Sequence, residues 1–346
     1  MKENKSYRKD IQDILETEYL WEKLRNKTIL ISGASGAIGQ VIVDTLIELN
    51  HQKDYNCKII AISRSEQRAK SIFGAYWEES CFHYYFCDIA ENVEIEEKID
   101  YIIHAASNTH PVQYATDPIG TIAANTWGSY HLLQLAQKNK AEFILLSSVE
   151  IYGENRSDKE VFSENDMGYL NCAEVRAGYP ESKRLAESLC YAFGRQYNLR
   201  FKIARLARVY GGTIREDDSK AISQFFHKAL KGENIVLKSE GKQLYSYIYV
   251  MDAVSAVFGI MLQGENQEVY NVSGTESSIT LYELAQEIAG IFGVFVERNL
   301  PNELEAAGFS KATKAVLDNS RLLALGWTEK TPILSGIKKV KEQMGE

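Results

Sequence analysis

Residues 28–43 read Thr-Ile-Leu-Ile-Ser-Gly-Ala-Ser-Gly-Ala-Ile-Gly-Gln-Val-Ile-Val. Ile29, Leu30 and Ile31 form a short apolar run, as expected of a strand that is buried on both faces of a parallel sheet. Glycines follow at three-residue spacing, and beyond them apolar residues recur with the helical period, at Ile38, Val41, Ile42, Leu46 and Leu49. A strand that turns through glycines into a helix gathers backbone N–H groups at one point, which suits a pyrophosphate.

The three glycines have different expected roles in such a turn. We expect Gly33 to permit the tight turn, Gly36 to let phosphates approach the backbone, and Gly39 to let the helix pack on its strand. The alternative is an ordinary strand–helix turn, but the required strand and amphipathic helix are both present. The predicted cofactor-binding residues of this turn are Gly33, Ser35, Gly36, Ala37, Ile38 and Gly39.

The composition limits the class of protein. With 346 residues, 45% of them apolar and 25% charged, the chain is long enough for one large or two modest domains. A net charge of −8 argues against a protein that binds nucleic acid over a broad basic surface. There is no apolar run that would cross a bilayer and no visible secretory signal, and the five cysteines lack metal-ligand spacing. We therefore expect a cytoplasmic protein with reduced cysteines, no metal, and neither nucleic-acid nor membrane partners.

Strands and helices alternate along the first half of the chain. Strand-like runs at 58–62, 82–86, 101–104 and 143–146 are separated by helical stretches. This α/β rhythm predicts a Rossmann-type doubly wound parallel sheet, in which ligands bind beyond the carboxyl ends of the strands. The further cofactor-binding candidates are Ser63, Arg64, Asp88, Ile89, Ala105, Ala106, Ser107, Asn125, Ser147 and Lys183.

Arg64 bears on the choice between the two nicotinamide cofactors. An acidic residue at the end of the second strand would bind the ribose hydroxyls of NAD, whereas a basic one accommodates the extra phosphate of NADP. The acid is absent and Arg64 is present, which slightly favours NADP. The alternative is a solvent-facing arginine, so the predicted cofactor is NAD or NADP. Asp88 is placed to accept from the adenine amino group, and small residues at 105–107 let a cofactor lie close to the backbone.

A tyrosine and a lysine carry the predicted chemistry. Tyr179 and Lys183 are four residues apart in a helical stretch, so they lie on one face a turn apart. A lysine ammonium and a positively charged nicotinamide would stabilise a tyrosinate, and Ser148 at the end of the fifth strand would bond the same substrate oxygen. A tyrosine and a lysine four residues apart are often no more than two side chains on the surface of a helix. Because this pair follows a glycine turn and a strand-end serine along the chain, it predicts a hydride-transfer site.

From about residue 27 onward the chain carries a series of motifs in one order: Gly-Ala-Ser-Gly-Ala-Ile-Gly, Asp88-Ile89, His104-Ala105-Ala106, Ser148…Tyr152-Gly153, Tyr179…Lys183 and Val209-Tyr210-Gly211. In these motifs the chain resembles the extended short-chain dehydrogenase/reductase family, in its NAD-dependent epimerase/dehydratase branch. The resemblance implies a nucleoside-diphosphate sugar as substrate, oxidised at C4 to a ketone. It also implies Ser148 as hydrogen-bonding residue, Tyr179 as base, Lys183 as its ribose-binding partner, and a homodimer formed by two helices from each cofactor domain.

Two further residues bear on which branch of the family the chain resembles. Dehydratases of the family typically have Asp-Glu after the serine or threonine, whereas this chain has Val149-Glu150. Glu150 is a catalytic candidate that either abstracts the proton beside the 4-ketone or holds a loop. Arg176 matches an arginine of the UDP-glucuronate decarboxylases, and it either binds a substrate anion or is simply exposed.

The chain departs from the family pattern at two substrate-binding positions. Arg208 stands where the family commonly has Asn, and Tyr245 stands where it has an Arg that contacts the diphosphate. Lys311 and Lys314 lie near the place of a further arginine cluster. Our hypothesis is that the cationic contact has moved from Tyr245 to Arg208, with Lys314 helping. The alternative is a substrate that is not a standard nucleotide sugar.

The predicted domains follow from the same segments. Residues 1–26 form a helical extension, with an amphipathic helix at 7–25 that packs on the core or on a second subunit. Residues 27–205 form the dinucleotide-binding domain, with a returning segment near 248–275. Residues 206–247 and 276–346 form a smaller α/β substrate lobe.

The predicted function is epimerisation, dehydration or decarboxylation of a nucleotide sugar with internal return of the hydride. One alternative is a net NADPH-dependent reductase of a keto sugar or another activated polyol or sugar. Another is a non-catalytic dinucleotide-binding regulatory protein, against which the intact Ser148, Tyr179 and Lys183 speak.

Overall fold

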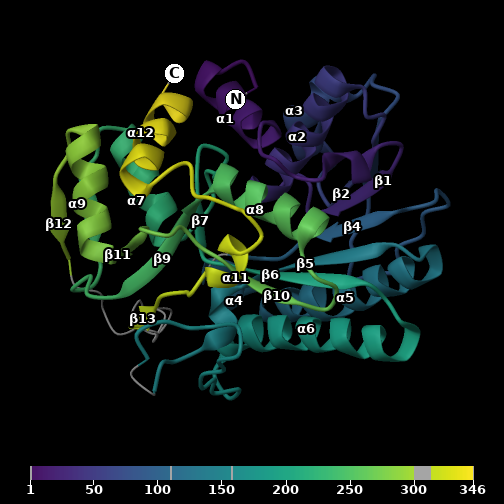
Figure 1. The fold of residues 1–346 in the computed structure, drawn as a ribbon. Helices are drawn as coiled ribbons and strands as arrows, with labels where there is room; N and C mark the ends of the chain where they lie inside the picture. The colour runs from purple at the N-terminus through teal and green to yellow at the C-terminus, as the bar shows by residue number, and fades with distance from the viewer. Residues whose placement is uncertain (1, 110, 157–158, 300–312, 346) are drawn as a thin grey trace.

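The computed structural model describes residues 2–109, 111–156, 159–299 and 313–345 (Figure 1). Within them a parallel sheet of seven strands has the order β10-β6-β5-β4-β1-β2-β3. Its strands are β1 (Thr28–Ser32), β2 (Lys58–Ser63), β3 (Phe82–Phe86), β4 (Tyr101–His104), β5 (Glu142–Ser148), β6 (Phe201–Leu206) and β10 (Val269–Val272). The strand order reverses between β1 and β4, which confirms the predicted Rossmann-type sheet.

Helices cover both faces of this sheet. Figure 1 shows α5 and α6 side by side along the lower face, and α2, α3 and α8 along the upper face. Their bounds are α2 (Ala37–Lys53), α3 (Glu66–Phe73), α4 (Pro111–Thr116), α5 (Pro118–Asn139), α6 (Gly178–Tyr197) and α8 (Val250–Gln263). Strand β1 feeds both layers, because Ile29 and Ile31 belong to one hydrophobic core and Leu30 to the other. This explains the continuous apolar run of the strand.

The C-terminal half adds smaller sheets beside the large one. Strand β9 pairs with β11, β13 and β7, and β8 pairs with β12. The strands are β7 (Arg208–Tyr210), β8 (Ile235–Leu237), β9 (Leu244–Tyr249), β11 (Ser278–Thr280), β12 (Val296–Arg298) and β13 (Lys314–Ala315). The helices are α7 (Ala221–Leu230), α9 (Leu281–Phe292), α11 (Ser320–Leu323) and α12 (Ile333–Met344). The segment near 248–275, predicted to return to the dinucleotide-binding domain, contains β10, which pairs with β6 of the large sheet. The predicted domain boundaries stay a prediction.

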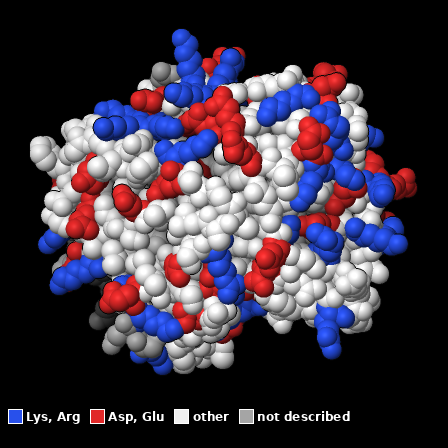
Figure 2. Space-filling view, viewed as in Figure 1, with Lys and Arg blue, Asp and Glu red and all other residues white. Residues whose placement is uncertain are grey.

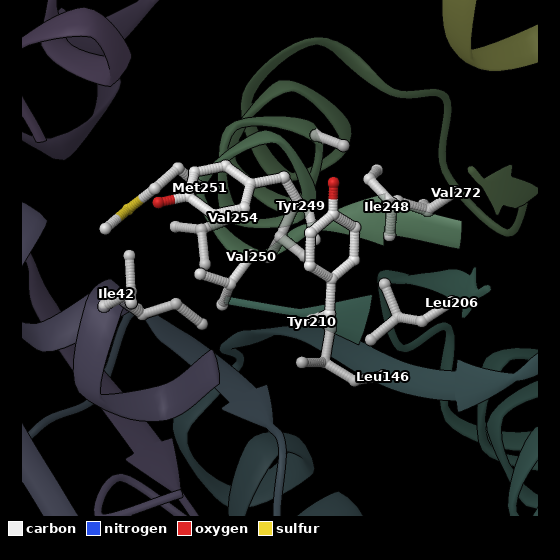
Figure 3. Close-up of a cluster of buried hydrophobic side chains, with 14 of the residues drawn as sticks. Ile42, Leu146, Leu206, Tyr210, Ile248, Tyr249, Val250, Met251, Val254 and Val272 are labelled. Atoms are coloured by element: carbon white, nitrogen blue, oxygen red, sulfur yellow. The ribbon is translucent and has the colours of Figure 1, made fainter. Parts of the chain in front are cut away.

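An apolar seam joins the large sheet to these smaller elements (Figure 3). Its side chains come from α2, the ends of β5, β6 and β10, and the β7, β9 and α8 segments: Ile42, Leu146, Leu206, Tyr210, Ile248, Tyr249, Val250, Met251, Val254 and Val272. Each fully buried side chain of this size contributes about 1.5–3 kcal/mol relative to an exposed one. The seam therefore packs the carboxyl ends of β5, β6 and β10 against the C-terminal half of the chain.

The N-terminal extension differs from its prediction. Instead of one helix over 7–25, the chain forms α1 (Lys5–Leu15) and a 3₁₀ turn, η1 (Trp21–Leu24). The helix ends because the Thr17 hydroxyl bonds the Ile14 carbonyl and the Trp21 indole bonds the Thr17 carbonyl, which turns Trp21 into the core. Helix α1 packs on α2, α8 and α12 of its own chain. Of the two predicted locations, the structure therefore has the extension on the core.

The surface carries mixed charge. Figure 2 shows Lys and Arg interspersed with Asp and Glu over the face displayed. Among the described residues, there is no helix with the length and apolar content needed to span a bilayer. The described residues also hold no group of three or more His, Cys, Asp or Glu side chains that is suited to a metal ion.

Candidate active site

The glycine turn lies at the carboxyl end of β1, where the strand order reverses. Gly33 has a φ of +69°, and a Cβ on it would lie 2.6 Å from the backbone of Ala106. A Cβ on Gly39 would lie 2.4 Å from the Gly33 carbonyl oxygen. These two glycines are therefore required by the packing of the turn against the segment after β4 and against itself.

The start of α2 suits a phosphate group. Gly36 is the N-cap of α2, and it brings no side chain to bond the first N–H groups of that helix. A Cβ on Gly36 would meet only the Gly33 carbonyl oxygen, at 3.1 Å, so the rest of its surroundings is open. Uncapped N–H groups beside open space at a strand end fit the pyrophosphate of a dinucleotide. Ser35, Ala37 and Ile38 lie on this same turn.

The predicted adenosine-binding residues lie at the ends of β2 and β3. The Arg64 guanidinium donates to Oδ1 of Asn108 at 3.1 Å and lies 3.8 Å from the Asp88 carboxylate. Ile89 is buried, and its carbonyl oxygen is 3.1 Å from Nδ1 of His131 on α5. Asp88 and Arg64 thus share one region of the strand ends, as the sequence predicts.

The structure brings the three predicted catalytic residues together. Tyr179 is buried in the first turn of α6, and its side chain lies beside Ser148 at the end of β5. Its ring stacks on that of Tyr114, with the centroids 4.7 Å apart. Burial raises the pKa of Tyr179 to about 12, although the nearby Ser148 hydroxyl acts in the opposite direction. Tyr114 lies on α4 and was not predicted from the sequence, since no local pattern relates it to Tyr179.

Lys183 lies one turn further along α6 and is buried. Its ammonium donates to the carbonyl oxygen of Leu146 on β5 at 2.9 Å. Burial lowers the pKa of Lys183 to about 8, and the negative charge of Glu187 opposes this effect. The side chain is thus anchored next to Ser148 and still carries a proton at neutral pH.

Asn125 on α5 connects the segment after β4 to α6. Its Nδ2 donates to the Ser182 hydroxyl at 2.9 Å, and its Oδ1 accepts from the Ser107 hydroxyl at 2.8 Å. Ser182 in turn donates to the Tyr179 carbonyl oxygen at 2.8 Å. These bonds fix the position of the first turn of α6, which carries Tyr179.

A buried ionic network of Ser147, Glu187 and Arg205 lies next to the predicted catalytic residue Lys183. The Ser147 hydroxyl donates to Glu187 at 2.5 Å, and the Arg205 guanidinium donates to both Glu187 carboxylate oxygens at 2.7–3.2 Å. The Ser147 hydroxyl, predicted to bind the cofactor, is thus bonded within the protein. Glu187 was missed, although its position four residues after Lys183 puts it on the same helix face.

A second group, here called the arginine cluster, consists of Glu150, Arg176, Arg208 and Tyr245. Arg176 and Arg208 bind the two carboxylate oxygens of Glu150 at 3.1 and 3.2 Å. Burial acts to raise the pKa of Glu150, but the two arginines together hold it below its ordinary value. The Arg208 guanidinium lies over the Tyr245 ring, 3.4 Å from its centroid. Three of the four predicted substrate-binding residues therefore lie together: Arg176 and Arg208 on Glu150, and Tyr245 under Arg208.

The fourth predicted substrate-binding residue has a different partner. Lys314 on β13 binds the carboxylate of Glu160 at 2.5 Å, and that glutamate is largely exposed. Strand β13 pairs with β9 at Leu244 and Tyr245, so Lys314 is close to the arginine cluster along the sheet. Lys311 lies outside the described residues.

A model of the NAD dependent epimerase/dehydratase family matches residues 29–273, which include the glycine turn, Tyr179 and Lys183. The chain belongs to this family. Membership confirms the predicted resemblance, the enzyme class and the nicotinamide dinucleotide as cofactor, because the family is NAD-dependent.

Curated proteins extend the similarity of this epimerase/dehydratase family member beyond the matched segment. The chain is 30% identical to UDP-glucuronic acid decarboxylase 3 of Arabidopsis thaliana over 323 residues, covering 92% of this chain and 89% of the relative. It is also 30% identical to UDP-glucuronic acid decarboxylase 1 of Danio rerio, covering 93% and 73% of the two chains.

Solved structures of low identity share the family fold. The UDP-glucuronic acid 4-epimerase of Bacillus cereus, in complex with UDP-glucuronic acid and NAD, has a TM-score of 0.79 at 18% identity, and the match covers 92% of this chain and 98% of that one. The UDP-glucose 4-epimerase of Thermotoga maritima, with UDP-glucose, has a TM-score of 0.78 at 23% identity and the same coverages.

Proposed function

We propose that the protein oxidises C4 of the sugar in a nucleoside-diphosphate sugar and works through a 4-keto intermediate, with Tyr179 as the base. One observation carries the proposal: the buried Tyr179 side chain lies beside Ser148 and one turn along α6 from the Lys183 ammonium. Ser148 and the glycine turn lie at the carboxyl ends of β5 and β1 of one sheet, where ligands of such sheets bind.

Tyr179, Ser148 and Lys183 have different roles in the proposed proton transfer. Bound NAD⁺ or NADP⁺ accepts a hydride and brings a positive charge. Tyr179 takes the proton of the C4 hydroxyl, and the Ser148 hydroxyl holds the same oxygen in place. The Lys183 ammonium favours the tyrosinate, which is needed because burial raises the pKa of Tyr179 to about 12. Burial excludes water from this transfer.

The arginine cluster supports an acidic substrate group. Two guanidinium groups surround the single carboxylate of Glu150, which leaves an excess of one positive charge. Among the described residues, the Nη1 atom of Arg208 is buried without a hydrogen-bond partner. A buried N–H group without an acceptor is unfavourable, so a substrate diphosphate or carboxylate would complete the cluster. This supports Arg208, with Arg176, as the cationic contact in place of Tyr245.

Among nucleotide sugars we favour a hexuronic acid. The curated relatives are UDP-glucuronic acid decarboxylases, and the cluster offers cations for a sugar carboxylate. Oxidation at C4 places the ketone β to this carboxylate, and a β-keto acid loses CO₂ readily. Loss of CO₂ leaves an enolate that takes a proton at C5 before the hydride returns, and Glu150 is our candidate to relay this proton from a water molecule.

Incubation with UDP-glucuronic acid tests the proposal, followed by mass spectrometry and NMR of the sugar nucleotide. Loss of CO₂ supports decarboxylation, loss of water supports dehydration, and an unchanged mass with inverted C4 supports epimerisation. If a panel of UDP-, dTDP-, GDP- and CDP-sugars is left unchanged by a protein that binds the cofactor, the proposal is wrong.

The nucleotide released on denaturation separates internal recycling from net reduction. Retained NAD⁺ or NADP⁺ supports a cofactor that is regenerated within each turnover. A protein that purifies without nucleotide and oxidises NADPH with a keto sugar supports the net reductase instead. Failure to bind either nucleotide supports the non-catalytic alternative.

We infer a homodimer formed through α5 and α6. Ile119 and Trp127 on α5 are 76% and 57% exposed, and Leu185 on the adjacent α6 is 49% exposed. Neighbouring exposed apolar side chains on two packed helices are typical of a subunit interface. Light scattering is expected to show a dimer for the native chain and a monomer for Trp127→Asp. Phe295→Asp, at an exposed apolar residue after α9, serves as the control and is expected to stay dimeric.

We also expect the protein in the cytoplasm. All five cysteines are free thiols, among them the buried Cys57 and Cys190. Free thiols in this number fit a reducing compartment. Thiol titration of freshly purified, unfolded protein is expected to count five reactive groups.

A further inference from the structure

Helix α6 is joined to strand β5 at two successive turns of the helix. At one turn the Lys183 ammonium donates to the Leu146 carbonyl oxygen at 2.9 Å. At the next turn the Ser147 hydroxyl donates to a carboxylate oxygen of Glu187 at 2.5 Å. Because the two strand residues are adjacent and the two helix residues are four apart, the two bonds together fix the position of α6 along β5.

Glu187 has a second partner on the neighbouring strand β6. The Arg205 guanidinium donates to both of its carboxylate oxygens at 2.7–3.2 Å. The side chains of Glu187 and Arg205 are only 6% and 3% exposed, so water does not replace either of them. Both carboxylate oxygens are thus bonded within the protein, and Glu187 has a fixed place one turn from Lys183.

The charge of Glu187 matters because Lys183 is buried. Burial lowers the pKa of Lys183 to about 8, and the negative charge of Glu187 opposes this effect. Arg205, bonded to Glu187 from β6, offsets part of that charge. Without Glu187, Lys183 would give up its proton at a lower pH, and its ammonium would no longer stabilise a tyrosinate at Tyr179.

Other groups around Lys183 do not supply a negative charge in its place. Burial raises the pKa of the Cys190 thiol on α6 and lowers that of His104 on β4 to about 3, so both are uncharged at neutral pH. Helix α5 packs on α6, and its charged side chain is Lys138, exposed near the end of the helix. Glu150, which acts on Tyr179, is paired with two arginines, so positive charge is in excess there.

We propose that Glu187 is a positioning residue of this site, which keeps the Lys183 ammonium charged and in register with Tyr179 and Ser148. The bond to Ser147 sets the register, and the carboxylate supplies the charge. The inference rests on the proposed function, because the role of Lys183 in supporting a tyrosinate comes from there. Glu187 itself acts only through Lys183, since its oxygens are already bonded to protein groups.

NMR of the full chain, labelled with ¹³C at the lysine Cε, measures the pKa of Lys183 in the same cofactor-bound state for every variant. Its signal is assigned by its absence from Lys183→Met. Glu187→Gln keeps the shape of the side chain and removes its charge, so we expect the pKa of Lys183 to fall by about one unit or more. Glu187→Asp keeps the charge and is expected to hold the pKa within about half a unit of the native value. An unchanged pKa in Glu187→Gln would overturn the inference.

Glu181→Gln is the matched control. Glu181 lies on the same helix but two residues before Lys183, on another face, and its carboxylate is 3.8 Å from Arg184 at the surface. We expect no shift of the pKa of Lys183 in this variant, and a shift equal to that of Glu187→Gln would overturn the inference. If Glu187→Gln does not fold, Glu187→Gln/Arg205→Met leaves no buried charge unpaired and is expected to lower the pKa in the same direction. No shift in the double variant would equally overturn the inference.

The pH profile of turnover separates this role from a merely structural one. Native turnover is expected to fall as the pH rises through about 8, because Lys183 supports a tyrosinate only while it is protonated. In Glu187→Gln the fall is expected about one unit lower, with the KM for the nucleotide sugar within about twofold of the native value. A kcat that is lowered equally at every pH would show a structural role and contradict the assignment.

The two measurements distinguish this inference from the proposed function. A shifted pKa of Lys183 in a protein that turns over no nucleotide sugar keeps the effect of Glu187 on Lys183 and loses the function. Turnover of a nucleotide sugar with a pKa and a pH profile that Glu187→Gln leaves unchanged does the reverse.

Discussion

The proposed catalytic residues and the arginine cluster lie at the same edge of the large sheet but are held in different ways. Tyr179 and Lys183 are buried on one helix, and their neighbours are backbone carbonyls, a stacked ring and a buried ion pair. Arg176 and Arg208 are partly exposed, come from distant segments, and meet on the carboxylate of Glu150. The first region is positioned by secondary structure and core packing, and the second by ion pairs between separate elements.

This difference predicts where each substitution acts. Changes in the buried region are expected to alter catalysis or stability strongly, because buried polar groups have no solvent to replace a lost partner. Changes in the arginine cluster are expected to act mainly on substrate affinity and to cost less stability, because its ion pairs are only partly buried and Glu150 keeps one arginine when the other is removed.

The largest expected effect is that of Tyr179→Phe. Removing the proton acceptor is expected to lower kcat by roughly 10³-fold or more, while the ring still stacks on Tyr114 and the fold persists. Turnover of the nucleotide sugar and cofactor affinity are the two measurements, and the affinity is expected to stay within about twofold. Tyr114→Phe, which keeps the stacked ring, is the control and is expected to retain most activity. A Tyr179→Phe variant with more than a tenth of native turnover would contradict Tyr179 as base.

Next comes the buried ionic network. Arg205→Met leaves the Glu187 carboxylate buried without its ion pair and is expected to lower the free energy of unfolding by about 3–5 kcal/mol. Arg200→Met, at an exposed arginine that binds Glu142 at 3.1 Å, is the matched control and is expected to cost less than about 1 kcal/mol. Urea unfolding followed by circular dichroism measures both. Equal losses in the two variants would remove the distinction between buried and exposed pairs.

A smaller effect is expected from His104 at the end of β4. Burial, and then the positive charge of Lys183, lower the pKa of His104 to about 3. The unfolded chain takes up this proton near pH 6.5 but the folded chain does not, so stability is present above that pH and is lost as the pH falls. We expect a loss of about 2 kcal/mol between pH 7 and pH 5 from this residue.

His104→Gln tests this assignment by unfolding at the two pH values. The variant is expected to remove that part of the pH dependence, whereas His51→Gln, at an exposed histidine of α2, is expected to keep it. An identical pH dependence in the native chain and in His104→Gln would show that the loss comes from other groups.

The smallest effect is expected in the arginine cluster. Arg208→Ala is expected to raise the KM for the nucleotide sugar about tenfold, through the loss of one charge-assisted contact, with cofactor affinity unchanged. The free energy of unfolding is expected to fall less than in Arg205→Met, because the Glu150 carboxylate keeps its ion pair with Arg176. Arg208→Lys keeps the charge but loses the planar contact with Tyr245, so an intermediate KM is expected. An unchanged KM in Arg208→Ala would exclude the relocated cationic contact.

Patterns short enough to be read along the chain predicted which segments bring Tyr179, Lys183 and the glycine turn into the structure they have. The glycine spacing located the turn after β1, and the interval of four residues put Tyr179 and Lys183 on one helix face. The single helix predicted over 7–25 was wrong, because Trp21 turns into the core and Thr17 bonds the end of α1. Such tertiary contacts cannot be predicted from the local spacing of apolar residues.

The sequence by itself determined the parallel sheet, the dinucleotide turn and the order of the catalytic residues, because these depend on strand burial, glycine conformation and helical repeat within short segments. Only the tertiary structure decided the partners of the charged groups. It bonded the Ser147 hydroxyl to Glu187, placed Arg208 between Glu150 and the Tyr245 ring, and fixed Arg68 at the Ser35 carbonyl oxygen. The physical reason is that a charged side chain pairs with whichever group the packing of distant elements brings within a few ångströms, and that distance is not encoded in local spacing.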